Sequence, residues 1–332
     1  MFIFTELELK SYIKVNREAI AVVEEGFTKL ANDEVEMPPI MRVDVHDQNG
    51  EVDVKTAYIT GADMFALKVS SGFFNNFKLG LPSGNGLMIL ISTKTGTPEA
   101  LLLDHGYLTE VRTAAAGAIA SKYLSRETIR TVGVIGAGSQ ARFQVRALKL
   151  VRNFKKIFVY ARSPEQAQKY AEDMHAELGV DVHVAESAEQ AVRSSDLIIT
   201  TTPAKEPIIK AEWLHPGLHI TAMGSDAEDK QELEVDVLAR ADRLVCDTTA
   251  QCARLGELHH ALEQGLLNES QVVELGQLTS KRLIGREHDQ QITIADLTGT
   301  GVQDTAIALF AFNEMTKRGL GLKIENNTEL KI

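Results

Sequence analysis

One short glycine-rich segment constrains the fold of this chain more than any other feature. Residues 131–135 form an apolar run that predicts a strand, and residues 136–141 follow it with the sequence Gly-Ala-Gly-Ser-Gln-Ala. Apolar residues then recur at helical spacing from Ala141 to Val151. A strand, a glycine-rich turn and a helix in this order are the context in which the pattern G-x-G-x-x-(G/A) binds a pyrophosphate. The segment therefore predicts a dinucleotide-binding domain.

Three small residues of this turn have separate physical roles. Gly136 permits the tight turn after the strand, Gly138 presents no side chain to the pyrophosphate, and Ala141 lets helix and strand pack closely. The N–H groups at the start of the helix then face the phosphates. The cofactor-binding candidates in this turn are Gly136, Ala137, Gly138, Ser139, Gln140 and Ala141.

The end of the next strand bears on which nicotinamide dinucleotide is bound. An acidic side chain there would bond the ribose 2′-hydroxyl of NAD and repel the 2′-phosphate of NADP. The predicted strand over residues 157–160 is instead followed by Ala161, Arg162 and Ser163, with no carboxylate. Arg162 and Ser163 can bind a 2′-phosphate, although Arg162 can also cover the adenine face of NADH. The sequence predicts NAD(P)H, with NADPH slightly favoured.

The wider pattern predicts an α/β protein with two kinds of sheet. An alanine-rich helix over residues 114–124 is expected to link them. Beyond it, helical patterns alternate with further short apolar runs, at residues 180–185, 197–201, 219–223, 244–246 and 292–295. This alternation predicts a Rossmann domain, with a doubly wound parallel sheet. Before the helix, Asn49-Gly50 and Thr95-Gly96 each separate two β-like segments, as hairpin turns do, so an α+β domain with a mostly antiparallel sheet is expected there.

Composition limits the remaining classes. The 332 residues exceed the usual size of one core, which favours two domains, and the net charge of -11 disfavours nucleic acid as a partner. The two cysteines, Cys246 and Cys252, are too few for a disulfide framework, and no surrounding pattern completes a zinc site, so no metal is expected. No signal peptide or membrane-spanning stretch is recognisable, so the expected location is cytoplasmic.

Several segments together resemble the ornithine cyclodeaminase/mu-crystallin family. They are residues 68–70, 80–87, 100–104, 109–115, 136–141 and 224–226. The segment Thr-Glu-Val-Arg-Thr-Ala-Ala at residues 109–115, combined with the downstream glycine-rich turn, is the most specific match, and the resemblance covers nearly the whole chain. Within the family the chain is similar to the ectoine-utilisation cyclodeaminase-like branch, which itself is similar to iminosuccinate reductase. The segments that carry this finer match are residues 59–63, 68–74, 78–83 and 224–228.

The resemblance implies an architecture and an assembly. Residues 1–120 and 305–332 are expected to form the substrate-binding and dimerisation domain. Residues 121–304 are expected to form the dinucleotide-binding Rossmann domain. The family also implies a homodimer.

The resemblance further implies a set of site residues. Arg112, Arg42 and Lys68 match the positions that bind the carboxylate of the substrate, and guanidinium groups suit this task because two parallel N–H bonds meet two oxygens. Lys68 is also a candidate for proton transfer, and Asp226 matches a carboxylate that contacts the amino group of the substrate in cyclodeaminases. A helix N-cap at the start of a helix near residues 230–238 is the alternative role for Asp226. The remaining cofactor-binding candidates are Thr113, Thr202, Met223, Gly224 and Ser225.

The sequence leaves two roles open: that of Asp304 and that of a second anchor for the substrate. Asp304 is expected to cap a last helix that begins near residue 305, with a position near the nicotinamide as the alternative. A dicarboxylate substrate would need a second cationic anchor, for which Lys78, Arg42 and the backbone around residues 70–71 are candidates.

Three functions fit these features. The first is an NAD(P)H-dependent imine reductase acting on a small 2-imino acid, with iminosuccinate, which yields aspartate, as the specific expectation. The second is a cyclodeaminase of the ornithine type, in which NAD+ is regenerated in each turnover. The third is a non-catalytic NADPH-binding protein of the crystallin type, which the presence of Lys68, Arg112 and Asp226 disfavours.

Overall fold

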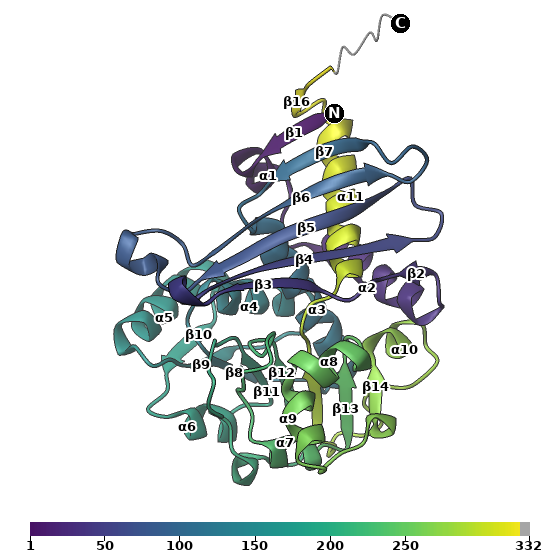
Figure 1. Cartoon of the computed structure of the whole chain (residues 1–332). Helices are drawn as coiled ribbons and strands as arrows, with labels where there is room; N and C mark the ends of the chain where they lie inside the picture. Colours follow the sequence, from purple (N-terminus) through teal and green to yellow (C-terminus); the bar gives the residue numbers. More distant parts are fainter. Residues whose placement is uncertain (326–332) are drawn as a thin grey trace, which may run out of the picture. The chain divides into compact units, whose positions relative to one another are not determined.

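The computed structural model describes residues 1–325, which fall into two compact units. The first unit contains Met1–Lys14, Asn32–Arg112 and the described residues from Thr300 onward, and the second contains Val15–Ala31 and Thr113–Gly299 (Figure 1). The expected domain limits at residues 1–120, 121–304 and 305–332 stay a prediction, and residues 326–332 lie outside the described part of the chain.

The first unit is built on a mostly antiparallel sheet, as predicted. Its strands are β1 (Phe2–Thr5), β2 (Val35–Glu36), β3 (Met41–Val45), β4 (Gly50–Ile59), β5 (Met64–Phe73), β6 (Gly84–Ser92), β7 (Pro98–Leu103) and β16 (Leu322–Lys323). Their order is β16-β1-β7-β6-β5-β4-β2, with β3 paired to β4. Strands β1 and β7 run parallel, while β4, β5 and β6 form long antiparallel ladders.

Both predicted hairpins are present in this sheet. Asn49 adopts the left-handed conformation, with φ 48°, at the turn between β3 and β4. Gly96 has φ 71° in the turn between β6 and β7. Asparagine and glycine tolerate this conformation better than other residues, which is why these two short signals are readable in the sequence.

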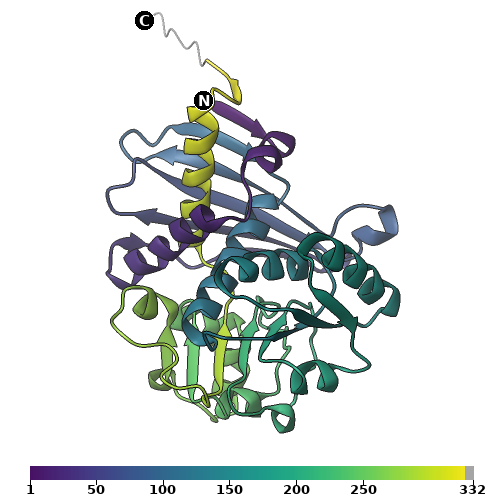
Figure 2. The same ribbon diagram turned by 180° about the vertical axis from the view of Figure 1, so that it is seen from behind.

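One long helix, α11 (Gly301–Lys317), covers one face of the sheet and contacts β4 and β5 (Figure 2). Thr305 holds this contact in place. Its hydroxyl donates to the carbonyl of Ala57 at 2.7 Å and accepts from the N–H of Ala66 at 3.0 Å. The helix is thereby fixed over two strands one turn after its start.

The predicted start of this helix near residue 305 and the predicted capping role of Asp304 are both wrong. The helix begins at Gly301, and its N-cap is Thr300. A side chain at Gly301 would place its Cβ 2.2 Å from the backbone oxygen of Thr56. The glycine is therefore needed for close packing of the helix against the backbone of β4.

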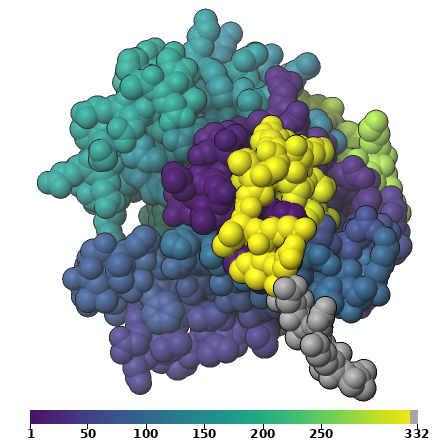
Figure 3. All heavy atoms as spheres, turned by 90° about the horizontal axis from the view of Figure 1, so that it is seen from above, coloured from purple at the N-terminus to yellow at the C-terminus, as the bar shows by residue number. Residues whose placement is uncertain are grey.

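The N-terminal segment packs beside α11. Helix α1 (Glu6–Tyr12) begins with a capping box at Thr5 and contacts α11. The ring of Phe312 on α11 meets Phe2 and Phe4 edge-on, with centroids 5.9 and 6.2 Å away. In Figure 3 the yellow α11 lies next to the purple N-terminal segment. Aromatic contacts of this kind hold the first strand against the last helix.

The second unit contains a fully parallel sheet, which confirms the predicted Rossmann architecture. Its strands are β8 (Thr131–Ile135), β9 (Lys156–Tyr160), β10 (Asp181–Val184), β11 (Leu197–Thr200), β12 (His219–Ala222), β13 (Arg243–Cys246), β14 (Val272–Glu274) and β15 (Thr293–Asp296). Their order is β10-β9-β8-β11-β12-β15-β13-β14. The order reverses between β8 and β11, and this reversal marks the edge at which such sheets bind ligands.

Helices cover both faces of this sheet. They are α2 (Arg17–Ala31), α3 (Tyr107–Leu124), α4 (Ser139–Val151), α5 (Pro164–Leu178), α6 (Ala188–Arg193), α7 (Val235–Ala239), α8 (Thr249–Leu255), α9 (Glu257–Glu263) and α10 (Leu275–Thr279). Alternation along β8 shows why two layers form: Val132 and Val134 pack into one buried cluster, and Ile135 packs into another. Apolar residues on both faces of a strand are the pattern expected for a sheet covered on both sides.

Two helix predictions need correction. Helix α3 begins at Tyr107 rather than at residue 114, because the carboxylate of Asp104 accepts the N–H of Leu108 at 2.8 Å and stabilises the first turn. The helix expected over residues 230–238 is reduced to α7, which begins at Val235. Within residues 1–325, no helix has the length and apolar character needed to cross a membrane.

Candidate active site

The glycine-rich turn has the geometry that a pyrophosphate requires. Gly136 has φ 110°, and a Cβ there would lie 2.7 Å from the hydroxyl oxygen of Thr201, so only glycine fits. Gly138 is the N-cap of α4, no side chain caps that helix, and a Cβ at Gly138 would meet nothing within 4 Å. Ala141 is fully buried between helix and sheet. The open space and the uncapped N–H groups fit a bound dinucleotide phosphate.

A buried glutamate, Glu232, connects the segments that follow strands β11 and β12. Sequence reasoning missed this residue. Glu232 accepts the N–H and the hydroxyl of Thr202 at 2.6 and 2.7 Å, and the N–H of Gly224 at 2.8 Å. Burial raises its pKa against these donors. The carboxylate therefore ties the segments after β11 and β12 together and positions the candidates Thr202 and Gly224. No local sequence signal marks Glu232, since the sequence predicts only a helix near residues 230–238 there.

The other cofactor candidates of the second unit have mixed roles. Gln144 donates to the backbone oxygen of Thr113 at 3.0 Å and to the side chain of Gln140 at 2.9 Å, so it links two candidates. The hydroxyl of Ser225 is buried and donates to the backbone oxygen of Lys230 at 2.6 Å, which indicates a structural role for that hydroxyl.

Three further cofactor candidates follow strands β9 and β12. Arg162 is exposed, and the hydroxyl of Ser163 caps α5 by accepting the N–H of Gln166 at 3.3 Å. Met223 follows β12, and its N–H donates to the carbonyl of Thr200 at 3.1 Å. The cofactor contacts expected of these residues stay predictions.

In the first unit, a carboxylate brings the substrate candidates Lys68 and Arg112 together. Asp304, in the first turn of α11, places Oδ2 2.8 Å from Nζ of Lys68 and Oδ1 2.9 Å from Nε of Arg112. Gln303, the preceding residue, accepts from Nη1 of Arg112 at 3.1 Å. All four side chains are buried. We call Lys68, Arg112, Gln303 and Asp304 the buried polar cluster.

The electrostatics of this cluster suit proton transfer near neutral pH. Burial lowers the pKa of Lys68 to about 7, and the charges of Arg112 and Lys55 add to this effect while Asp304 opposes it. Burial alone would raise the pKa of Asp304, but Lys68 and Arg112 outweigh it and hold that pKa below its usual range. Burial also raises the pKa of Asp104 to about 6. A lysine that titrates near pH 7 can both donate and accept a proton there.

Arg42 lies outside the buried polar cluster. On β3 its guanidinium contacts Glu51, lies 3.0 Å from Asp44 and lies 3.7 Å from Asp53. Among the described residues, its ion pairs are with these three carboxylates of the same sheet. The substrate-binding role expected of Arg42 stays a prediction.

Lys55 is a third buried cation of the first unit, beside Lys68 and Arg112, and sequence reasoning missed it. It pairs directly with Lys68 in the register of β4 and β5, so both side chains occupy the same face of the sheet, and Lys55 is 6% exposed. Its charge acts on both Lys68 and Asp304. The signal that would have found it is the hairpin register: a tight turn over residues 60–63 sets Lys55 opposite Lys68.

Asp226 lies in the second unit, in the irregular segment after β12. Its side chain is 45% exposed and forms an ion pair with Lys230 at 2.6 Å. The alternative reading of Asp226 as a helix cap is wrong, because α7 begins at Val235 with Glu234 as its N-cap. A catalytic role for Asp226 stays a prediction.

The two cysteines meet in the core of the second unit. The ligand atoms of Cys246, Cys252 and Asp296 lie within 4.8 Å of one another, and all three are buried. The thiol of Cys252 donates to Asp247 at 3.1 Å, and Asp296 accepts the N–H of Leu258 at 3.0 Å. These hydrogen bonds already satisfy the carboxylates, so the group is explained as a polar network, and we assign no metal to it.

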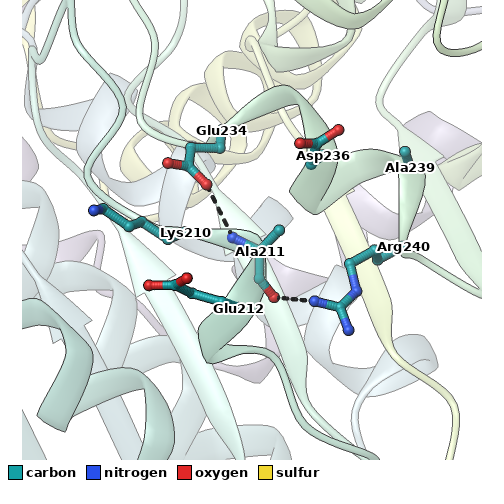
Figure 4. A pocket seen from close by; sticks show the side chains of 7 residues that line it. All are labelled: Lys210, Ala211, Glu212, Glu234, Asp236, Ala239 and Arg240. Atoms are coloured by element: carbon teal, nitrogen blue, oxygen red, sulfur yellow. Dashed lines mark hydrogen bonds between the residues drawn. The ribbon is translucent and has the colours of Figure 1, made fainter.

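A surface hollow of the second unit lies between η3 (Ala211–Trp213) and α7 (Figure 4). Its polar groups bond to each other: the N–H of Ala211 donates to Glu234 at 3.1 Å, and Arg240 donates to the carbonyl of Ala211 at 2.6 Å. None of the predicted cofactor or substrate residues lines it. We therefore assign it no part in the chemistry.

Comparison with known sequences gives a consistent picture. A model of the ornithine cyclodeaminase/mu-crystallin family matches residues 2–319. A putative dehydrogenase of Rhizobium meliloti is 50% identical over 98% of this chain and 99% of its own length. An alanine dehydrogenase of Archaeoglobus fulgidus is 37% identical over 97% and 98%. An iminosuccinate reductase of Paracoccus denitrificans is 32% identical over 98% and 100%.

Solved structures agree with the sequences. The Thermococcus litoralis Δ1-pyrroline-2-carboxylate reductase in complex with NADH and L-proline superposes with a TM-score of 0.93 at 32% identity, covering 98% of this chain and 100% of that one. An archaeal alanine dehydrogenase dimer with bound NAD gives 0.92 at 35% identity, over 98% and 99%. The Paracoccus denitrificans iminosuccinate reductase in complex with NAD+ gives 0.90 at 32% identity, over 98% and 99%.

Proposed function

The chain belongs to the ornithine cyclodeaminase/mu-crystallin family, and from that premise we propose that it is an NAD(P)H-dependent reductase of a small 2-imino acid. The named relatives support this class, since alanine dehydrogenase, Δ1-pyrroline-2-carboxylate reductase and iminosuccinate reductase all act at a carbon that carries nitrogen beside a carboxylate. The reaction adds a hydride to the carbon of C=N and a proton to the nitrogen.

The observation that carries this proposal is the buried polar cluster. Lys68 and Arg112 are held by Asp304 at 2.8 and 2.9 Å in a place from which water is excluded. Two cations kept in a dry site recognise an anion strongly, because little solvent screens their charge. A carboxylate of the substrate is such an anion.

Each residue then has a defined task. Arg112 binds the α-carboxylate and makes the imine carbon more electrophilic. Lys68, with a pKa of about 7, holds the proton that the nitrogen receives. Asp304 fixes the positions of both cations. The dinucleotide held at the glycine-rich turn supplies the hydride when bound.

The finer proposal is that the substrate is iminosuccinate and the product is aspartate. An iminosuccinate reductase is among the relatives of the chain. A dicarboxylate needs a second cationic anchor, and Lys55 is suited to it, because this lysine is buried and faces the same side of the sheet as Lys68. Lys55 thus joins Lys78 and Arg42 as a candidate anchor for the second carboxylate.

The test follows the absorbance of NADPH and NADH with purified protein. Oxaloacetate plus ammonia supplies iminosuccinate, and pyruvate plus ammonia and glyoxylate plus ammonia are the controls. We expect rapid oxidation specific to the oxaloacetate mixture, and comparing the two dinucleotides ranks them. No oxidation in any mixture, together with ammonia release from ornithine at catalytic NAD+, would replace this proposal with a cyclodeaminase.

The Lys55→Met variant tests the substrate within the same assay. We expect KM for the oxaloacetate mixture to rise about 10- to 100-fold, the size of one lost charged hydrogen bond, while turnover of the pyruvate mixture is retained. Equal losses with both mixtures would argue against Lys55 as the anchor of the second carboxylate.

We also propose that the protein is a homodimer joined through the open face of the first unit's sheet. Helix α11 covers one face, and Figure 1 shows the other without a helix of this unit across it. Leu67, Ile89 and Leu101 stand side by side there on neighbouring strands, and each is only partly buried. An apolar sheet face of this kind normally marks an interface, and the archaeal alanine dehydrogenase relative is a dimer.

A further inference from the structure

We propose that Gln303 contacts the substrate and donates its Nε2–H to the α-carboxylate that Arg112 binds. This inference rests on the proposed function and adds a residue that hydrogen-bonds to the α-carboxylate of the substrate. The sequence offered no reason to select Gln303, because a glutamine in the first turn of a helix is ordinary.

Only one of the two polar atoms in the Gln303 side-chain amide has a hydrogen-bond partner among the described residues. Its side chain is fully buried, and its Oε1 accepts from Nη1 of Arg112 at 3.1 Å. Its Nε2 is buried and has no hydrogen-bond partner among residues 1–325. A buried amide donor without a partner is costly, and native proteins seldom leave one unmet. The missing partner is therefore expected to be a ligand.

The orientation of this amide follows from chemistry. A guanidinium group carries only donors, so the oxygen of Gln303 must face Arg112 and the nitrogen must point elsewhere. Turning the amide over would set two donors against each other. The hydrogen bond from Arg112 therefore fixes the orientation of the amide, with its Nε2–H beside the guanidinium group.

The group that meets Nε2 is an acceptor and carries negative charge. The donor selects an acceptor, and the adjacent charges of Arg112 and Lys68 repel a cation such as an ammonium group. Asp304 does not meet the need in the structure: its oxygens lie against Lys68 and Arg112, and Nε2 of Gln303 has no partner among the described residues. A carboxylate has two oxygens and can accept from a guanidinium and an amide together.

The experiment compares two variants at this position with one control. Gln303→Met removes the donor at nearly constant volume, and Gln303→Glu replaces it with an acceptor that repels a carboxylate. Gln291→Met is the control, because Gln291 is a buried glutamine of the second unit whose oxygen accepts the N–H of Glu287 at 2.7 Å. Thermal unfolding of each variant shows that it is folded.

The readouts are kinetic constants with the oxaloacetate mixture, the Kd for NADH, and binding of L-aspartate and L-alanine in the presence of NAD+ by calorimetry. We expect Gln303→Met to raise KM and the amino-acid Kd about 10- to 100-fold, with kcat changed less than about threefold and the Kd for NADH unchanged. Gln303→Glu should weaken carboxylate binding further, and Gln291→Met should leave it unaltered.

The outcomes separate this inference from the proposed function. An unchanged KM and Kd in Gln303→Met, or a wild-type protein that binds neither amino acid, overturns the role of Gln303. If the wild type reduces no imine but binds an amino acid that Gln303→Met binds more weakly, the proposed function fails and the inference stands.

Discussion

At the scale of single residues, Asp304 determines how the two cations of the buried polar cluster, Lys68 and Arg112, are used. A buried charge is costly unless it is paired and bonded, and Asp304 pairs with Lys68 and Arg112 at once. The pKa values follow from this arrangement: that of Asp304 is low and that of Lys68 is about 7. Asp304 is therefore a positioning residue, since it acts through Lys68 and Arg112.

Replacing Asp304 with asparagine should leave two buried cations without a counter-charge. We expect Asp304→Asn to lower the free energy of unfolding by about 3 kcal/mol and kcat/KM at least about 100-fold, because both cations lose their position. Denaturant unfolding and steady-state kinetics measure the two effects. Asp63→Asn, which breaks an exposed pair with Lys94, should change neither, and wild-type kinetics in Asp304→Asn would contradict the assigned role.

The pKa of Lys68 predicts the direction of a pH profile. A lysine with a pKa of about 7 is protonated below that pH and neutral above it. If Lys68 supplies the proton, kcat for imine reduction should fall as the pH rises through about 7. Lys68→Arg keeps a positive charge but titrates far higher, so its residual activity should not show this fall. A profile that stays flat from pH 6 to pH 9 in the wild type would argue against Lys68 as the donor.

At the scale of elements, the turn between β8 and α4 contains two glycines, and each position requires glycine for a different physical reason. Gly136 is required by its own backbone, since it has φ 110° and lies close to Thr201. Gly138 has an ordinary backbone and open space around it. The structure of the protein alone does not need glycine at this second position, whereas an approaching pyrophosphate does.

This difference predicts opposite effects of two alanine substitutions. Gly136→Ala should lower the free energy of unfolding by about 2 kcal/mol, from backbone strain and the contact with Thr201. Gly138→Ala should leave stability within about 0.5 kcal/mol but raise the Kd for NADH at least about tenfold, because the added methyl group occupies the phosphate position. Thermal unfolding and fluorescence titration with NADH measure these effects. Unaltered NADH binding in Gly138→Ala would contradict the placement of the pyrophosphate.

At the scale of the whole molecule, the open sheet face of the first unit is the feature that a single chain leaves unexplained. Val43 and Met41 on the edge strand β3 are 53% and 60% exposed, and the row of Leu67, Ile89 and Leu101 is only partly buried. Exposed apolar area of this kind costs free energy in water. A second copy of the chain would cover it.

A charged substitution on this face should separate the proposed dimer. We expect Ile89→Glu to convert the wild-type dimer into a monomer, because it would bury a carboxylate in an apolar interface. Light scattering coupled to size-exclusion chromatography gives the mass. Glu165→Lys, an exposed change on helix α5 of the second unit, serves as the control. A wild-type protein that is monomeric at micromolar concentration would refute the dimer.

The parts that local sequence alone determined are those set by neighbouring residues. The turn at residues 136–141, the hairpins at Asn49 and Gly96 and the two sheet types follow from glycine, asparagine and apolar spacing, and the structure has all of them. Local patterns failed where the cause was distant in the chain. The last helix begins at Gly301, which lies against the backbone of Thr56, and Glu232, which no local pattern marks, is fully buried.

The tertiary structure decided which candidates work together. Lys68 and Arg112 could be selected by family resemblance, but their shared carboxylate lies about 200 residues further along the chain. Lys55 joins them only through the register of β4 and β5. Burial and nearby charges set the pKa of an ionisable group. The sequence identifies the ionisable residues, but only the fold decides which of them are buried and which partner each one contacts.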